Sequence, residues 1–409
     1  MERSASLVII GAGIVGCAAA RFLTDLGWRD IVVVDRGPLF AAGGSTSHAP
    51  GIVFQTSGSR TMTKFAQETI ALYDSLEHQG QPCWYGVGSL EVATTPRRWT
   101  DLHRKLGWAR SWGVEASLLT PAETAAWLPL IDGERILGAY AVRSDGVAKP
   151  VWAAEALATA ATGATFYSRT AVTGFETERG RVRAVQTTNG LIETDRVLVC
   201  CGIWGPSIGR MAGVPIPLAP VEHQLAWTTP LPELAGTTVE IAQPVVRHQD
   251  ADLYFRQRRD GYAVGGYGHE PVVVDAAAIR AHGEPDDMPA SNPFDAEAFV
   301  PSWRGAVDLI PALGQVEIAE AINGMFSFTP DGFPLLGESD RLRGFWVAEA
   351  IWITHAGGAA RAVAQLMSDG YADLDLHECD LNRFDHYAVT PAYVRERGAQ
   401  QYREVYDVI

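Results

Sequence analysis

The chain has 409 residues, a formal net charge of −15 and 47% hydrophobic residues, which is enough apolar material for about two domains. The negative charge argues against binding to nucleic acid or to an anionic membrane surface. No apolar run approaches the roughly 20 residues that span a bilayer. The chain passes directly into its first expected strand, so a cytoplasmic protein without a signal peptide is predicted. Five cysteines without metal-ligand spacing indicate reduced thiols and no metal site.

The stretch from Leu7 to Asp35 has the pattern of a βαβ unit. Two apolar β-branched runs flank about four turns of helix made of small residues. In the connecting sequence GAGIVG, Gly11 permits a tight turn, Gly13 lets the backbone approach a pyrophosphate, and Gly16 lets helix and strand pack closely. The N–H groups at the helix start would face the phosphates. Asp35 ends the second strand, where a carboxylate can bind a ribose hydroxyl, so a dinucleotide site is predicted.

A loop rich in glycine and hydroxyl groups follows, with the sequence GGSTSHAPG at 43–51. Its small residues would let a ligand approach the backbone. His48 lies in the middle of this loop. The composition alone leaves its role open between a ligand-binding residue and a loop histidine hydrogen-bonded to neighbouring hydroxyls.

The rest of the chain alternates between helical and strand patterns. Apolar residues at helical spacing predict helices at 61–76, 97–112, 151–161, within 294–313, and from about 358 to 367. Apolar runs predict strands at 172–176, 182–187, 191–193 and 196–202, with a hairpin turn at Asn189-Gly190. The region 215–300 is strand-rich, which predicts a separate antiparallel sheet with strands at 222–228, 245–248, 252–257 and 262–266.

These patterns predict the α/β class, with a nucleotide-binding domain interrupted by a substrate domain. The nucleotide-binding domain is expected at residues 1–82, 141–218 and 325–409. The inserted domain, of α+β type around the antiparallel sheet, is expected at residues 83–140 and 219–324.

Several motifs taken together resemble the dimethylglycine oxidase and sarcosine dehydrogenase family, within the D-amino-acid-oxidase-like FAD amine oxidoreductases. The resemblance covers nearly the whole chain, and its most specific parts are the histidine loop and the FSFTPDG sequence. The motifs that carry it are GAGIVG at 11–16, GGSTSHAPG at 43–51, SLEVATT at 89–95, RHQDADLYFR at 247–256, FSFTPDG at 326–332 and the run from Glu349 to Gly358.

The resemblance implies a Rossmann-like FAD-binding domain, with FAD rather than NAD, and a flavin tethered covalently through His48. Asp35 would then bind the adenosine ribose, and the backbone near Val172 would contact the adenine. A helix start at 355–358 would stabilise negative charge on the reduced flavin. The residues expected to bind the cofactor are Gly11, Gly13, Ile14, Val15, Gly16, Asp35, Arg36, Ser45, Thr46, Ser47, His48, Ile52, Val172, Gly202, Gly332, Thr354, His355, Ala356, Gly357 and Gly358.

Oxidation of an amine C–N bond requires the neutral amine, and a nearby proton acceptor helps to supply it. The family places a catalytic histidine at the position of His223, and Tyr254 matches a tyrosine that shapes the same pocket. Each could instead be an ordinary strand residue, His223 bonded to backbone and Tyr254 half-buried. A substrate carboxylate would need a cation, and the sequence does not choose among Arg247, Arg256 and Arg258.

The sequence therefore predicts FAD-dependent demethylation of a secondary or tertiary N-methyl amine, such as dimethylglycine or sarcosine, with hydride passing to the flavin and formaldehyde released. The alternatives are an oxidase of another amine or cyclic imino acid, and an electron-transfer or regulatory flavoprotein subunit without its own substrate. Dioxygen or a carrier flavoprotein would reoxidise the flavin.

Relatives of this type usually carry a C-terminal folate-binding half, and this chain stops near where that half would begin. Either the chain stands alone or it is a fragment. In both cases folate chemistry is expected to need a separate partner, and the substrate, acceptor and oligomeric state stay open.

Overall fold

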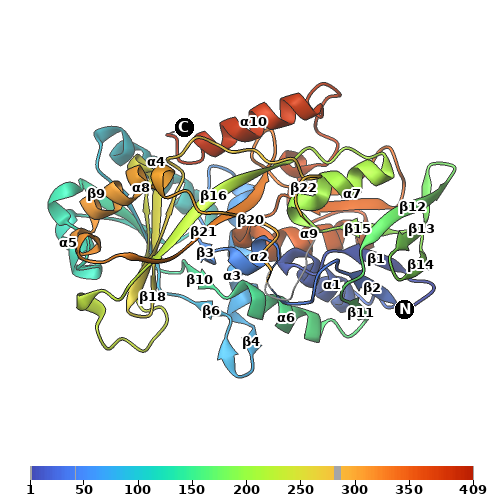
Figure 1. The fold of residues 1–409 in the computed structure, drawn as a ribbon, viewed down its shortest axis with the longest axis horizontal. Coiled ribbons are helices and arrows are strands. Elements are labelled where there is room, and N and C mark those ends of the chain that lie inside the picture. Colours follow the sequence, from blue (N-terminus) through green and yellow to red (C-terminus); the bar gives the residue numbers. More distant parts are fainter. Residues whose placement is uncertain (1, 42, 281–286, 409) are drawn as a thin grey trace.

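The computed structural model describes residues 2–41, 43–280 and 287–408. Figure 1 shows two lobes side by side, one built around a six-stranded sheet near the N-terminus and the other around a nine-stranded sheet. The helix α10 (Pro391–Arg403) lies across the top of both lobes in this view.

The six-stranded sheet has the strand order β11-β2-β1-β15-β23-β22. All its neighbouring pairs are parallel except β22 with β23, which is antiparallel. Its members, in sheet order, are β11 (Ala164–Tyr167), β2 (Ile31–Val34), β1 (Leu7–Ile10), β15 (Val197–Val199), β23 (Phe345–Glu349) and β22 (Leu335–Glu338).

Alternate residues of the buried strands serve two hydrophobic cores. Leu7 and Ile9 of β1 pack toward the helices, whereas Val8 and Ile10 pack toward the opposite layer. Because both faces are covered, these strands are continuous apolar runs, as expected for a parallel sheet. The helical layer contains α1 (Ile14–Asp25), α3 (Arg60–Asp74), α6 (Pro150–Ala160) and α9 (Ala356–Asp369), and the opposite layer contains β12 (Val172–Glu178), β13 (Arg181–Thr187), β14 (Gly190–Glu193) and α7 (Gly205–Ala212).

The nine-stranded sheet has the order β20-β21-β16-β19-β18-β17-β7-β9-β8. It is antiparallel except where β7 meets β17, a parallel pair that joins the two pieces of chain. The strands, in sheet order, are β20 (Ser291–Asn292), β21 (Ile318–Phe328), β16 (Ala219–Thr228), β19 (Gly261–Gly266), β18 (Leu253–Arg258), β17 (Val245–His248), β7 (Ser89–Ala93), β9 (Gly138–Val142) and β8 (Ala116–Leu119).

The two faces of this sheet have different neighbours. Leu253 and Phe255 face a core that includes residues of α8 (Ala296–Leu309). Tyr254, between them, belongs to the other face, because successive side chains of a strand point to opposite sides. On that second face, α4 (Pro96–Trp112) packs against Tyr140 and Val142 of β9, and the remaining area borders a cavity.

Shorter elements complete the fold. A small sheet joins β3, β10 and β6, and β4 pairs with β5. These elements are α2 (Ser45–His48), β3 (Ile52–Val53), β4 (Glu77–His78), β5 (Gln81–Pro82), β6 (Trp84–Tyr85), α5 (Pro121–Trp127), β10 (Gly146–Ala148) and the 3-10 turns at 133–135, 202–204, 232–234, 249–251, 311–315, 353–355 and 377–379.

The predicted α/β fold class is confirmed, and the observed elements lie close to the predicted ones. The loop at 43–51 differs, because its centre forms the single helical turn α2. The nine-stranded sheet takes strands from 89–142 and 219–328, so β9 and β21 extend past the expected boundaries at 140 and 324. The division into two domains stays a prediction.

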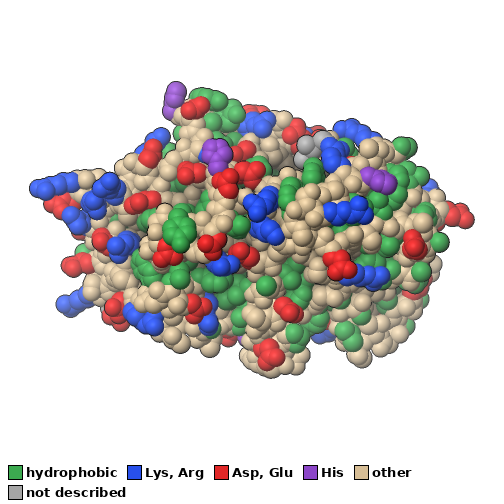
Figure 2. All heavy atoms as spheres, turned by 180° about the vertical axis from the view of Figure 1, so that it is seen from behind, with side chains coloured by type: hydrophobic (Ala, Val, Ile, Leu, Met, Phe, Trp, Pro, Cys, Tyr) green, Lys and Arg blue, Asp and Glu red, His purple; other side chains and the backbone are tan. Residues whose placement is uncertain are grey.

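The surface carries charges of both signs. Figure 2 shows acidic and basic side chains interspersed on the rear face. The hairpin β12–β13, at the N-terminal lobe's outer end, carries the exposed Arg179, Arg181 and Arg183. None of the helices in the described part of the chain has both the length and the apolar character that a membrane crossing requires.

Candidate functional site

A cavity of about 700 Å³ runs between the two sheets. Its walls come from the ends of β1, β2, β15 and β23, from α2, and from the second face of the nine-stranded sheet. Its size lies in the range of pockets that hold small molecules or cofactors. The cavity therefore joins the predicted nucleotide site to the predicted substrate site.

The glycine-rich turn after β1 has the geometry that its sequence predicts. Gly11 has φ +107°, and a Cβ there would lie 2.4 Å from the carbonyl oxygen of Cys200. Gly13 is the N-cap residue of helix α1 and has no side chain to cap it. Ile14 N donates to Thr46 Oγ1 at 3.1 Å, and the first turn of the helix lines the cavity. The amides at a helix N-terminus that lack an intrahelical partner form an anion site.

The acid at the end of β2 lies at the same edge. Asp35 Oδ2 accepts a hydrogen bond from Ala12 N at 2.8 Å, and Oδ1 accepts one from Gly37 N at 2.8 Å. These bonds fix the carboxylate beside the glycine turn. Asp35 also lines the cavity, where a ribose could reach it. Ribose binding by Asp35 stays a prediction.

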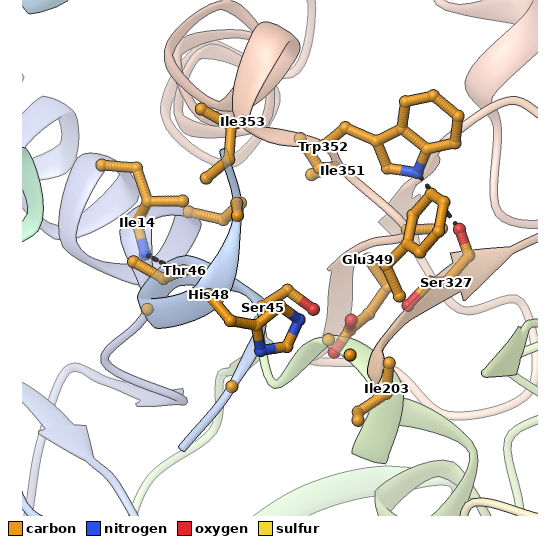
Figure 3. Close-up of a pocket in the computed structure, with 18 of the residues that line it drawn as sticks. Ile14, Ser45, Thr46, His48, Ile203, Ser327, Glu349, Ile351, Trp352 and Ile353 are labelled. Carbon is orange, nitrogen blue, oxygen red and sulfur yellow. Dashed lines mark hydrogen bonds between the residues drawn. The ribbon is translucent and has the colours of Figure 1, made fainter. Parts of the chain in front are cut away.

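The turn α2 directs His48 into the cavity (Figure 3). The His48 ring lies against Gly324 of β21, where a Cβ would come within 2.8 Å of the ring. Nε2 lies 3.2 Å from the carbonyl oxygen of Met325, and Ser45 Oγ donates to the same oxygen at 3.0 Å. Because a carbonyl only accepts, Nε2 carries the hydrogen and Nδ1 keeps its lone pair. Burial lowers the pKa of His48 to about 4, although the bond to Met325 opposes this shift.

Glu349, at the end of β23, also points into the cavity (Figure 3). It is 1% exposed, and Oε1 accepts a hydrogen bond from Cys201 N at 2.6 Å. Burial raises the pKa of Glu349 to about 8, although hydrogen bonds from Cys201, Gly202 and Ala350 oppose this shift. Among the described residues, Oε2 has no protein partner.

The strand register of the nine-stranded sheet places one row of residues across the cavity wall. Arg247 of β17 pairs with both Glu91 and Tyr254. Tyr254 pairs with Gly265, and Gly265 with Leu225. Directly paired residues share a face, so Arg247, Tyr254 and Leu225 all point to the cavity, as His223 does two residues before Leu225.

Glycine makes room for the tyrosine in this row. A Cβ on Gly265 would lie 2.0 Å from Tyr254 Cζ, so the ring lies directly across the glycine. The hydroxyl of Tyr254 is 2.8 Å from His223 Nε2. The two predicted catalytic residues therefore form one hydrogen-bonded pair at the cavity wall.

Burial dominates the electrostatics of this pair. Burial, together with the nearby His269 and His48, lowers the pKa of His223 to about 3. Burial also raises the pKa of Tyr254 well above its usual value. Both side chains are therefore neutral at physiological pH.

The three candidate arginines lie on the same face of the sheet. They differ in their position along the strands, and only Arg247 reaches the cavity. Arg247 lines the cavity, and its Nε is a buried donor without a partner among the described residues. Burial would lower the pKa of Arg247, but Tyr406 and Glu91 raise it, and the side chain stays charged. Arg256 instead donates to the carbonyl of Pro50 at 2.7 Å, and the exposed Arg258 pairs with Glu320 at 3.0 Å.

Of the 22 residues predicted for the site, 17 line the cavity, so the structure brings them together. Their functional roles stay predictions. The lining members of that set are Gly11, Gly13, Ile14, Val15, Asp35, Arg36, Ser45, Thr46, Ser47, His48, Ile52, Val172, Gly202, His223, Tyr254, Thr354 and His355.

The other five residues, Gly16, Gly332, Ala356, Gly357 and Gly358, lie outside the lining. A Cβ on Gly358 would lie 2.4 Å from Phe65 Cα of α3, and the amide of Gly358 donates to Thr69 Oγ1 at 3.1 Å. The glycines at the start of α9 thus let two helices pack closely, and their contact with a flavin stays a prediction. Ala356 is fully buried.

Gly16 and Gly332 also have packing roles. A Cβ on Gly16 would lie 2.0 Å from Gly11 O, which leaves this glycine between helix and turn. Gly332 has φ +80° in a turn beside Gln401 of α10.

Sequence reasoning did not assign several residues of the site. Glu349 follows an apolar strand as Asp35 does, and this shared pattern could have identified it. Tyr267 lies with its ring centroid 4.4 Å from that of His223, and Tyr406 contacts Arg247 from beyond α10. Nothing local in the sequence marks either tyrosine.

Comparison with known proteins agrees with the motifs. The family description "FAD dependent oxidoreductase" matches residues 6–366, and "FAD dependent oxidoreductase central domain" matches residues 369–409. The chain is 31% identical to the mitochondrial sarcosine dehydrogenase of Homo sapiens, over 100% of this chain and 45% of that protein. It is 30% identical to the mitochondrial dimethylglycine dehydrogenase of Rattus norvegicus, over 97% of this chain and 47% of that protein. The resemblance inferred from the motifs is confirmed.

A relative of a different kind matches equally well. The chain is 30% identical to the mitochondrial pyruvate dehydrogenase phosphatase regulatory subunit of Mus musculus, over 100% of this chain and 46% of that protein. The chain thus spans about half the length of the curated relatives it matches. L-proline dehydrogenase from P. horikoshii has a similar structure, with a TM-score of 0.81 at 24% identity over 94% of this chain and 98% of that one. That likeness shows the fold alone.

The residues of the cavity fit FAD, the cofactor that the family description implies. The glycine turn and the N-terminus of α1, which line the cavity, suit a pyrophosphate. His48 Nδ1 and Glu349 Oε2 are buried polar atoms without a partner among the described residues, and such atoms normally meet a ligand or water. His48, Glu349 and the α1 turn would therefore hold the cofactor.

Replacing Glu349 with glutamine should change how stability depends on pH. The unfolded carboxyl titrates near 4.5 and the folded one near 8. Between these values the folded state keeps a proton that the unfolded state releases, so this group lowers stability as pH rises. Glu349→Gln cannot ionise at this position, so its stability does not fall in this way. The difference in free energy of unfolding between variant and parent should therefore shift in favour of the variant by on the order of a few kcal/mol from pH 5 to pH 8.

The measurement is thermal or denaturant unfolding of parent and variant, prepared identically, from pH 5 to pH 8. Glu115→Gln, at an exposed position, is the control and should follow the parent. A constant difference between Glu349→Gln and the parent at all pH values would show that Glu349 is ionised throughout this range.

Proposed function

Because the chain belongs to the FAD-dependent oxidoreductase family, we propose that it oxidises a secondary or tertiary N-methyl amino acid, such as dimethylglycine or sarcosine. The products are formaldehyde and the demethylated amine. The observation that carries this proposal is the row of Arg247, Tyr254 and His223 on one cavity wall. The row offers a buried cation for a carboxylate and a polar pair for an amine.

The carboxylate end of the substrate would meet Arg247. Its guanidinium lies 3.7 Å above the Phe54 ring and 3.7 Å from Glu91 Oε1. Glu91 also binds Lys105, at 2.7 Å, and Lys105 lies 3.9 Å from Asp101. The Nε of Arg247, which has no partner among the described residues, can donate to a substrate carboxylate.

The amine end would lie among aromatic rings. Tyr254, Tyr267, Phe326 and Trp352 line the cavity near His223. Their faces attract the methylammonium form through cation–π contacts. Tyr254, bonded to His223, then accepts the amine proton. When bound, FAD supplies the acceptor for the hydride of the N-methyl carbon. Water then adds to the iminium that oxidation leaves, which releases formaldehyde and the demethylated amine.

The covalent tether to FAD is part of this proposal. Met325 O holds His48 Nε2, which leaves Nδ1 as the ring nitrogen that can carry the tether. Its depressed pKa keeps the nitrogen unprotonated and nucleophilic.

Several attributes of the whole protein stay proposals. Dioxygen or a carrier flavoprotein would take up the electrons, and folate chemistry would need a separate partner. The compartment is also open, because the sequence predicts the cytoplasm whereas the names of the relatives include mitochondria. The second candidate function is a regulatory flavoprotein subunit, favoured by the similarity to the phosphatase regulatory subunit.

Anaerobic spectra test the activity directly. Addition of dimethylglycine or sarcosine should remove the oxidised-flavin absorbance. In His223→Ala the reduction should slow by roughly 10²–10⁴-fold, the usual effect of a positioned acid–base group, whereas reoxidation by dioxygen should change little. A flavin that no N-methyl amino acid reduces would overturn the enzymatic proposal and favour the regulatory one.

The tether is tested by acid precipitation. Flavin should stay with the precipitated parent and enter the supernatant from His48→Ala. Ser45→Ala is a matched control, because it removes a neighbouring hydrogen bond to Met325 O and keeps the histidine. Flavin in the supernatant of the parent would refute the tether.

Arg247→Gln tests the carboxylate contact. We expect KM for sarcosine to rise by roughly 10–10²-fold, the worth of a charge-assisted hydrogen bond. N-Methylpropylamine lacks the carboxylate, so its KM in the variant should stay near its KM in the parent. Arg258→Gln, on the same sheet face but exposed, is the control. An equal loss for both amines would show that Arg247 supports the fold rather than the carboxylate.

A further inference from the structure

A chain of hydrogen bonds leads from the cavity wall toward the protein surface. Tyr254 Oη lies 2.8 Å from His223 Nε2. The other ring nitrogen, His223 Nδ1, lies 3.2 Å from Tyr402 Oη. Tyr402 Oη lies 2.7 Å from His269 Nε2, and His269 Nδ1 lies 2.9 Å from the carbonyl oxygen of Glu270. Four side chains from three elements and a loop therefore form one continuous path.

The contact between His269 Nδ1 and the carbonyl oxygen of Glu270 determines which atom is the donor in every other hydrogen bond of the path. A backbone carbonyl only accepts, so His269 Nδ1 carries the hydrogen and His269 Nε2 accepts from Tyr402. The Tyr402 oxygen then accepts from His223 Nδ1, and His223 Nε2 accepts from the Tyr254 hydroxyl. Each hydrogen points outward, and lone pairs on the Tyr254 oxygen remain for a donor in the cavity.

The two ends of the path have different access to water. Tyr254 and Tyr402 are 5% and 0% exposed, and Tyr254 and His223 line the cavity. His269 is half-buried and follows the exposed Gly268. The path therefore connects a cavity-facing hydroxyl with a histidine that water can reach.

We propose that Tyr254, His223, Tyr402 and His269 form a one-way proton relay that removes the amine proton of the substrate to solvent. This inference rests on the proposed function, because it needs an ammonium substrate in the cavity. Tyr402 and His269 do not touch the substrate and act as positioning and relay residues.

The proton balance of the relay is complete. The substrate ammonium gives its proton to Tyr254 Oη, and the Tyr254 hydrogen moves to His223 Nε2. His223 Nδ1–H passes to Tyr402 Oη, and the Tyr402 hydrogen moves to His269 Nε2. The resulting imidazolium of His269 releases one proton to water. One proton leaves the substrate and one enters solvent, with no change in oxidation state.

A relay also resolves a difficulty with His223 as a simple base. Its burial makes the imidazolium costly, so His223 is a poor store for a proton. Passing the proton through the ring at two nitrogens avoids a long-lived charge there.

Each member of the path has charged or titratable neighbours. Tyr254 faces Tyr406, Tyr402 and Arg256. His223 faces His48, His269 and Tyr267. Tyr402 faces Tyr267, Asp252 and Glu222. Beside His269, Glu270 forms an exposed ion pair with Arg403 at 3.0 Å.

Nitrogen-15 NMR of histidine-labelled protein tests the direction of the path without any substrate. Both His223 and His269 should carry a hydrogen on Nδ1, and Nε2 of His223 should carry none. Tyr402→Phe removes the acceptor of His223 Nδ1 and should shift the His223 signals. A hydrogen on His223 Nε2 in the parent would overturn the relay as drawn.

Anaerobic stopped-flow reduction tests proton transfer. Tyr402→Phe keeps the ring and should slow reduction by about 10–10²-fold near pH 7, where the amine is protonated. The rates of variant and parent should converge near pH 10, where neutral amine arrives from solution. His269→Ala should behave alike and recover in added imidazole, because the site is open to water.

Glu270→Gln is the matched control, since it removes an exposed carboxylate next to His269 and keeps the backbone carbonyl. It should follow the parent at every pH. A pH-independent loss in Tyr402→Phe would assign Tyr402 a packing role and overturn the relay. If no amine reduces the parent flavin, the proposed function fails, and the NMR result still decides the direction of the path.

Discussion

The pairing of β16 with β21 is the constraint on which the site depends. It places His223 opposite Gly324, and the His48 ring lies against the same, cavity-facing side of that glycine. The next residue, Met325, offers its carbonyl to both His48 and Ser45. A slip of one residue in this register would turn His223 away from the cavity and remove the glycine beneath His48. One strand therefore aligns the cofactor side and the substrate side of the cavity.

Burial gives the cavity its chemical character. It makes neutral forms favourable for His48, His223 and Glu349, each of which would be charged at some pH in water. Neutral imidazoles have one donor and one acceptor, so they can direct hydrogen bonds rather than hold charge. Arg247 is the exception, because Glu91 and Tyr406 keep it cationic. On the wall formed by the nine-stranded sheet, a neutral histidine–tyrosine pair thus lies near a charged arginine.

The same framework can serve different functions in different proteins, since the relatives include dehydrogenases and a regulatory subunit. Fold alone does not choose among them. The choice rests on side chains that a cofactor-holding subunit would not need. The Tyr254–His223 pair and the arginine beside it are such groups, and they lie across the cavity from the glycine turn that suits the nucleotide.

The sequence by itself determined the local structures and the family. The GAGIVG turn, the apolar strands around it, the hairpin at Asn189-Gly190 and the helix caps each depend on residues close together in the chain, where backbone preferences and periodicity act directly. The motifs at 43–51 and 326–332 identified His48 and the strand beside it as parts of one site.

Only the tertiary structure decided which distant residues meet. Arg247 was separated from Arg256 and Arg258 by its place along the strands, which no local pattern encodes. Gly357 and Gly358 resemble a ligand-binding turn in sequence, yet they face α3 because packing places that helix against them. Tyr402 meets His223 across 179 residues of chain, and such a contact depends on how whole helices and sheets pack, since hydrogen bonds between side chains require atoms within about 3 Å.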